Sequence, residues 1–168
     1  QDGPSASFMA PSGIAQQQVV QSAMEKSTPS VVNCIEAHGT GTALGDPIET
    51  AALKHVRTQV ENLLCASLGA LKSEMGHAEG AAGIVGLIKA VEALANASMP
   101  CNLHLLQSNP AIDMTGFAAS LLSQGALTQE NVASMGVSSF GYSGTNSHAI
   151  LRHSKSYSIL VISVCVKI

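Results

Sequence analysis

Two histidines occupy glycine-rich loops that each follow a predicted strand and precede a predicted helix. The first loop reads His38-Gly39-Thr40-Gly41-Thr42, and the second runs over residues 72–83 and contains His77. Open α/β sheets bind ligands at the carboxyl ends of their strands. A single histidine in such a loop is more often structural, but two in matched settings could converge on one small oxyanion and donate hydrogen bonds to it. The pair therefore indicates stabilisation of a developing negative charge, with Lys72 as a third titratable candidate.

The elements that must position these loops alternate along the chain. Apolar spacing, capping residues and β-branched runs distinguish helices from strands. The predicted elements are helix 14–26, strand 31–37, helix 46–60, strand 63–71, helix 80–97, and strands 117–122, 135–140 and 146–152. This order predicts an α/β fold with a mixed five-stranded sheet and helices on its faces.

Two of the helices carry specific sequence signals. Asp46 is predicted to be an N-cap, with Pro47 at the first helical position and Glu49 at the reciprocal capping position. In helix 80–97 apolar residues at positions i, i+3, i+4 and i+7 indicate the helical period. They are Ile84, Leu87, Ile88 and Val91. We interpret Glu79 and Asp46 as favourable charges at helix starts and not as site residues.

The composition excludes several classes of function. The 168 residues carry a formal charge of −3, with 46 % hydrophobic and 11 % charged residues, and no basic stripe, so nucleic acid is not an expected partner. No compact Cys/His spacing predicts a metal site. The four cysteines form no CxxC pair and are expected to be reduced, buried thiols of an intracellular, cytoplasmic protein. They are Cys34, Cys65, Cys101 and Cys165.

The two ends of the chain are unusual for a complete domain. The sequence begins Gln1-Asp2-Gly3 with no initiator Met and no signal peptide, and we expect it to be a fragment of a longer chain. Residues 157–168 form an apolar run that is shorter than the about 20 residues needed to span a bilayer. We expect this run to be an extra strand, or sequence foreign to the domain, and expect no membrane span.

Five motifs together resemble one known family. HGTGT, LGDPIE, KSxxGHxEGAAG, NPxID and GVSSFGYSGTNSHAIL occur in this order between His38 and Leu151. They resemble the C-terminal half of type I ketosynthases, the β-ketoacyl synthases of the thiolase-like superfamily. On this resemblance residues 1–30 are the end of the N-terminal half, 31–153 the C-terminal half, and 154–168 an atypical apolar tail.

The resemblance implies a specific activity and specific partners. A β-ketoacyl synthase joins an acyl thioester to a malonyl-type thioester by decarboxylative Claisen condensation, in polyketide or fatty-acid biosynthesis. No cofactor would be bound by this chain, because the substrates are carried on the phosphopantetheine of an acyl carrier protein. The implied partners are that carrier protein, the missing N-terminal half and, when the enzyme is complete, a second copy in a homodimer.

The resemblance also implies roles for individual residues. His38 and His77 would hold the enolate oxygen, and Lys72 would order the second histidine. Two threonines and a tyrosine would bind the substrate arm, with the tyrosine replacing the usual gating phenylalanine. They are Thr40, Thr42 and Tyr142.

The nucleophilic cysteine of the family has no counterpart in this chain. In the family it lies on a small-residue turn of the N-terminal half, and no such turn occurs here. Cys34 is separated from His38 by roughly 13 Å of extended chain, too far for a catalytic dyad. We therefore expect the isolated chain to be inactive as an acyltransferase.

Other functions remain open from the residues alone. Gly39, Gly41 and Gly45 follow a strand as in dinucleotide-binding proteins, although their spacing is one residue too long. Ser143 lies in a GYSGT turn that departs from the G-x-S-x-G elbow of serine hydrolases. A non-catalytic ketosynthase-like partner subunit and a thiolase-like acyltransferase are the two alternatives within the superfamily.

Overall fold

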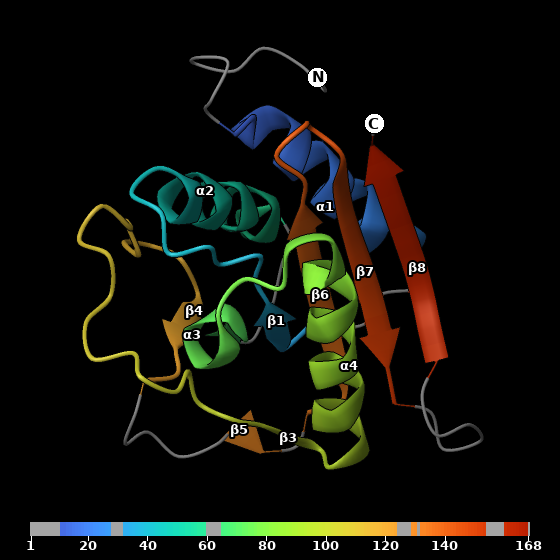
Figure 1. Ribbon diagram of the computed structural model, residues 1–168. Coiled ribbons are helices and arrows are strands. Elements are labelled where there is room, and N and C mark those ends of the chain that lie inside the picture. Colours follow the sequence, from blue (N-terminus) through green and yellow to red (C-terminus); the bar gives the residue numbers. More distant parts are fainter. Residues whose placement is uncertain are drawn as a thin grey trace.

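A mixed sheet runs through the centre of the computed structural model, which describes residues 11–27, 32–59, 65–123, 129–130, 132–153 and 160–167 (Figure 1). Within these residues the main sheet has six strands, in the order β4-β2-β1-β6-β7-β8. The strands β4, β2, β1 and β6 are parallel, whereas β7 and β8 are antiparallel to their neighbours. Their bounds are β1 Cys34–Glu36, β2 Ala66–Gly69, β4 Ala119–Leu121, β6 Ser134–Phe140, β7 Asn146–Arg152 and β8 Leu160–Lys167.

The sheet confirms the predicted α/β class and corrects the predicted number of five strands. The additional strand is β8, which lies in the apolar C-terminal run and pairs with β7 along its length. Ser163 of β8 donates a hydrogen bond to the carbonyl of Ala23 at 2.7 Å, and Cys165 is buried in the same core. Residues 160–167 of the run therefore form an extra strand that packs on the domain. A small second sheet, β3 Ser98–Met99 with β5 Gln129–Glu130, was not predicted.

Helices cover both faces of the main sheet. On one face α1, Gly13–Lys26, and α2, Gly45–Thr58, pack over a core that includes Ile35 and Leu53. On the other face α4, Ala82–Ala95, packs over a second core that includes Cys34. Successive side chains of a strand point to opposite faces, so neighbouring residues of β1 serve different cores. None of the described helices combines the length and apolar character required to cross a membrane.

The apolar pattern of α4 is only partly turned towards the core. Leu87 and Val91 pack against the second core, whereas Ile84 and Ile88 are 55 % and 54 % exposed. The buried positions of the helix are Gly86, Lys89, Ala90, Ala93 and Leu94. Small residues let the helix approach the sheet closely, and Lys89 finds acidic partners beneath it. Two bulky residues therefore lie on the surface of the described part of the chain.

The start of α2 also differs in detail from the prediction. The helix begins at Gly45 after Leu44, and Asp46 is its second residue instead of its N-cap. The Asp46 carboxylate accepts a hydrogen bond from the amide of Gly41 at 3.1 Å, so it closes the preceding loop. Glu49 does not cap the helix either, because its carboxylate binds amides of that same loop. The first turn of α2 is thus tied to the loop that carries His38.

Candidate active site

The carboxyl ends of β1, β2 and β6 meet at one edge of the sheet. Since β1 pairs in parallel with both other strands, the segments that follow them emerge side by side. His38 lies two residues beyond β1, Lys72 three residues beyond β2, and Phe140 at the end of β6. The topology therefore gathers residues that are far apart in sequence at a position where open α/β sheets bind ligands.

The two candidate histidines lie next to each other at this edge. Their ring centroids are 5.9 Å apart, with an angle of 86° between the ring planes. The ring of Phe140, a residue that sequence reasoning did not select, lies 5.7 Å from that of His38. Its only sequence signal was its position at the end of a predicted strand. The site is thus a pair of imidazoles with an aromatic wall on one side.

The imidazole of His38 is partly buried and lies near the positive charge of Lys72. Burial, helped by the charges of Lys72 and His77, lowers the pKa of His38 to about 4. Its Nδ1 is buried and has no hydrogen-bond partner among the described residues. The lowered pKa means that the ring is neutral near pH 7.

The ring of His77 is oriented by the backbone of its own loop. The amide of Glu79 donates a hydrogen bond to Nδ1 of His77 at 2.9 Å. Because Nδ1 accepts this hydrogen bond, the ring proton is assigned to Nε2. Nε2 can then donate a hydrogen bond to a ligand. Glu79 has a positive φ of 48°, a strained conformation for this residue type that is common at functional turns. The backbone of Glu79, and not only its charge, therefore contributes to the site.

Lys72 connects the two loops. It is the first residue of α3, Lys72–Met75, and its ammonium donates to the backbone carbonyl of His38. The sequence-based hypothesis linked Lys72 with the second histidine, whereas this hydrogen bond joins it to the backbone of the first. Burial lowers the pKa of Lys72, and the nearby carboxylates oppose this shift. These carboxylates belong to Glu49, Glu36 and Asp46.

Glu49 is the site residue that the sequence analysis missed. Its carboxylate accepts hydrogen bonds from the amides of His38 at 2.7 Å and Gly39 at 2.9 Å. Burial raises the pKa of Glu49 to about 7, and the two amide hydrogen bonds oppose this rise. A signal was present, because Glu49 shares the buried face of α2 with Leu53 and Val56 at positions i+4 and i+7.

A close approach of backbones requires glycine at position 39. Gly39 has a positive φ of 48°, and a Cβ there would lie 2.5 Å from the Cβ of Ala70. The loop after β1 thus packs directly on the segment after β2. Any larger residue would separate the two loops that carry the histidines.

The other candidate residues lie at two separate places. The hydroxyls of Thr40 and Thr42 are 3.2 Å apart, and that of Thr42 also accepts from the amide of Gly45 at 3.0 Å. Tyr142 is 79 % exposed in the turn that follows β6. The structure therefore brings the two threonines together and leaves the tyrosine on the surface.

Cys34 lies in a core environment and not in the site. It is fully buried beneath α4, and burial raises the pKa of its thiol to about 11. Such a thiol is a poor nucleophile near neutral pH because almost none of it is ionised. Among the described residues no group of three or more His, Cys, Asp or Glu side chains is arranged to hold a metal ion.

This combination of fold and site agrees with the comparison to known families. Residues 1–106 match the family described as beta-ketoacyl synthase, C-terminal domain. The chain belongs to this family, and it is the C-terminal half-domain of a ketosynthase with the thiolase-like fold.

The individual relatives are polyketide synthases. The chain is 43 % identical to polyketide synthase GfsA of Streptomyces halstedii over 94 % of its own length and 2 % of that protein. It is 42 % identical to erythronolide synthase EryA2 of Saccharopolyspora erythraea over 90 % of its length and 4 % of that protein. The chain thus spans only a small part of the curated relatives it matches.

Solved ketosynthases share the fold. Ketosynthase twelve of the bacillaene polyketide synthase from Bacillus amyloliquefaciens superposes with a TM-score of 0.81 at 31 % identity, over 91 % of this chain and 28 % of that one. The oxazolomycin ketosynthase domain of Streptomyces albus gives the same TM-score at 30 % identity, with 91 % and 28 % covered. The chain therefore matches just over a quarter of each of these solved chains.

Proposed function

We propose that this chain supplies the oxyanion-binding half of a β-ketoacyl synthase that extends polyketide chains by decarboxylative Claisen condensation. The observation that carries the proposal is the 5.9 Å separation of the His38 and His77 rings at one sheet edge. His38 is neutral near pH 7, and the hydrogen bond from Glu79 leaves Nε2 of His77 as the donor. Two imidazole N–H groups can stabilise one oxyanion by hydrogen bonding without transferring a proton.

The chemistry begins with a malonyl-type thioester on the phosphopantetheine of an acyl carrier protein. The bond to the carboxylate carbon breaks, carbon dioxide leaves, and the electron pair moves onto the thioester carbonyl oxygen. His38 and His77 donate hydrogen bonds to that oxygen, and each donor of this kind is worth about 3–4 kcal/mol. The enolate carbon then attacks the acyl thioester, a carbon–carbon bond forms, and the thiolate that held the acyl group leaves.

The hydroxyls of Thr40 and Thr42 are proposed to hydrogen-bond the phosphopantetheine arm. The pair is partly exposed beside the histidine loop, and the Thr42 oxygen already accepts from Gly45. A hydroxyl that accepts one hydrogen bond keeps its own proton for a second partner. Tyr142 is proposed to gate the entry of the arm, because its exposed turn follows the Phe140 wall of the site.

The nucleophile is proposed to come from the N-terminal half of the ketosynthase, outside this chain. The exposed pair Ile84 and Ile88, one turn apart on α4, supports a contact with that half. Incubation of the chain with an acyl-carrier thioester, followed by mass spectrometry, is expected to show no specific covalent adduct. An adduct on Cys65, Cys101 or another residue of this chain would contradict the proposal.

The activity is tested by joining this chain to the N-terminal part of the bacillaene ketosynthase named above, in place of that enzyme's own C-terminal part. The fusion is expected to decarboxylate a malonyl carrier protein, and H38A or H77A should each lower the rate about 10²- to 10³-fold. H55A, which removes an exposed histidine of α2, is the matched control and should leave the rate unchanged. Full activity of H38A and H77A would contradict the proposed role of the two rings.

The isolated chain provides an independent measurement. Titration with phosphopantetheine, followed by NMR, is expected to shift the signals of Thr40, Thr42 and the His38 ring. A titration that shifts none of these signals would contradict the proposed binding mode even if the fusion does not fold.

A further inference from the structure

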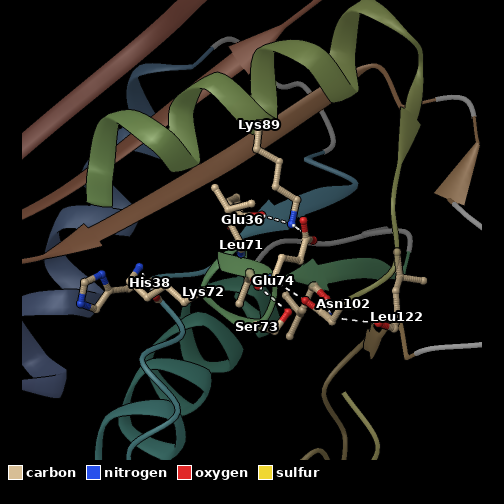
Figure 2. A network of polar contacts seen from close by, with 11 residues as sticks. Glu36, His38, Leu71, Lys72, Ser73, Glu74, Lys89, Asn102 and Leu122 are labelled. Carbon is tan, nitrogen blue, oxygen red and sulfur yellow. Dashed lines mark hydrogen bonds and ion pairs between the residues drawn. The ribbon is translucent and has the colours of Figure 1, made fainter. Parts of the chain in front are cut away.

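A buried lysine of α4 extends towards the end of β1 and towards α3 (Figure 2). The side chain of Lys89 is 8 % exposed, and its Nζ lies 3.1 Å from Glu36 Oε2 and 3.2 Å from Glu74 Oε1. The side chain of Glu36 is 3 % exposed. We call Glu36, Lys89 and the partly exposed Glu74 the ionic triad. We propose that Lys89 and Glu36 are positioning residues, which hold the two histidine loops at the spacing that the proposed oxyanion site requires.

The first connection of the triad joins β1 to the second loop. Glu36 is the last residue of β1 and precedes His38 by two positions. Its Oε1 accepts a hydrogen bond from the amide of Leu71 at 2.5 Å, and Leu71 directly precedes Lys72. The strand end from which the first histidine emerges is therefore bonded to the start of the loop that carries the second.

The second connection joins α4 to the short helix α3. Glu74 lies in α3, three residues before His77, and its carboxylate accepts a hydrogen bond from Lys89. Lys89 in turn belongs to the helix that follows the His77 loop. One ammonium group is thus hydrogen-bonded to the carboxylate of α3 and ion-paired with the carboxylate at the end of β1.

Packing alone does not fix the position of α3. None of its four residues is buried, Met75 is 59 % exposed, and a small cavity lined by Leu71, Met75 and Gly86 separates α3 from α4. The helix is one turn long, so its own hydrogen bonds add little stability. Polar contacts must therefore hold it, and in Figure 2 these contacts lead to the triad on one side and to the backbone of His38 on the other.

Asn102 anchors the chain at the end of β2, just before α3. Its Oδ1 accepts from the amide of Ala70 at 2.6 Å, and its Nδ2 donates to the carbonyls of Leu68 and Leu122 at 3.0 and 2.9 Å. These bonds anchor the end of β2 to the neighbouring segment. The position of α3 beyond that anchor depends on Glu36 and Lys89.

A buried ion pair is weak as a device for stability. Well-packed apolar residues of similar volume are often as stabilising, because charges lose hydration when they are buried. The triad has two carboxylates and one ammonium, and Glu36 also opposes the fall in the pKa of Lys72. The triad links β1, α3 and α4. We infer that its main role is to fix the relative positions of these elements and not to add stability.

The test uses the chain itself and three single variants. K89M removes the ammonium, K89R keeps a positive charge, and K54M breaks the exposed ion pair with Asp113 as a matched control far from the triad in sequence. The readouts are the NMR cross-peak between the His38 and His77 ring protons, the exchange rate of the Leu71 amide, and stability in urea. We expect K89M to weaken the cross-peak severalfold and to speed Leu71 exchange about tenfold, whereas K89R restores both and K54M changes neither.

A purely structural role gives a different result. In that case K89M lowers stability, but the folded molecules keep the wild-type cross-peak, and this outcome overturns the proposal. If K89M does not fold, the double variant E36Q/K89M removes both charges and keeps an oxygen that can accept from Leu71. The double variant is expected to fold with a weakened cross-peak, and a wild-type cross-peak would overturn the proposal.

The proposed positioning role rests on the proposed function. The fusion described above tests the two separately. We expect E36Q/K89M to lower kcat about 10- to 100-fold with KM for the malonyl carrier protein nearly unchanged. If H38A and H77A abolish activity while E36Q/K89M does not lower kcat, the positioning role fails alone. If H38A and H77A keep activity while the cross-peak responds to K89M, the proposed function fails and the positioning of the rings stands.

Discussion

The carboxylate of Glu49 accepts a hydrogen bond from the backbone amide of His38 at 2.7 Å. Its other oxygen accepts from Gly39 at 2.9 Å, and the side chain is 4 % exposed. The first turn of α2 therefore determines where the backbone of the histidine loop lies. A carboxylate suits this position because both of its oxygens are acceptors.

The variant E49Q is predicted to destabilise the chain by about 1–3 kcal/mol. The substitution replaces one acceptor oxygen with an NH₂ group, which then faces a backbone N–H donor in a buried place. Urea denaturation measures the loss, and exchange of the His38 and Gly39 amides should become faster. E92Q, on the exposed side of α4, should change stability by less than about 0.5 kcal/mol. Equal effects of the two variants would show that the Glu49 bonds contribute little.

The packing of α4 predicts a large loss of stability for substitutions on its buried side and a small one for substitutions on its exposed side. L94A removes a fully buried side chain and should cost about 2–5 kcal/mol. I88S changes a residue that is 54 % exposed and should change the stability of the isolated chain by only about 0.5 kcal/mol. Thermal or urea denaturation distinguishes them. A large loss for I88S in the isolated chain would mean that α4 packs by the face that carries Ile88.

The buried His148 predicts a specific dependence of stability on pH. Burial lowers the pKa of His148 from 6.5 to about 4, and its Nδ1 is 3.0 Å from the hydroxyl of Ser138. Between these two pH values the unfolded chain binds more protons than the folded chain, so stability falls as the pH falls from 6.5 towards 4. The loss from this residue is on the order of 3 kcal/mol.

Urea denaturation across this pH range checks the prediction. In H148Q the loss of stability on acidification should be smaller than in the unaltered chain, because one of its titrating groups is absent. H153Q removes an exposed histidine just beyond the same strand and should leave the loss unchanged. An identical pH profile for H148Q and the unaltered chain would contradict the assignment.

The threonine pair predicts a split between loop stability and ligand binding. T42V removes the acceptor of the Gly45 amide, so it should destabilise the loop and weaken phosphopantetheine binding. T40V leaves that acceptor in place and should weaken binding with little loss of stability. T58V, which removes a hydroxyl bonded to the carbonyl of His55 in α2, is the control for binding. Calorimetric titration should detect about a tenfold weaker affinity for T40V, and unchanged affinity would contradict its role.

The sequence predicts the order and type of most elements because local signals are strong there. The β-rich run before His38, the return strand over residues 146–152 and the helix that begins near Asp46 appear where they are expected. Strand lengths are less predictable, because pairing with a neighbour and not propensity decides where a strand ends. The short helix α3 escapes prediction since its polar contacts come from residues distant in sequence.

The site is less accessible to sequence reasoning than the fold. The motifs select His38, His77 and Lys72, and helical spacing could indicate that Glu49 is buried, but nothing local shows that its carboxylate would bind an adjacent loop. The burial of Lys89 in α4 escapes prediction for a related reason. A count of apolar positions cannot anticipate that a lysine with two acidic partners, Lys89, would be buried in preference to Ile84.

The position of β8 at one end of the strand order has a practical consequence. Within the described residues its outer edge has no strand beside it, and Val164 and Val166 are 53 % and 57 % exposed. An exposed edge strand with apolar side chains can pair with a strand of another molecule. Concentrated samples of the chain should therefore form oligomers, and a lysine in place of Val164 should raise the concentration at which they first appear.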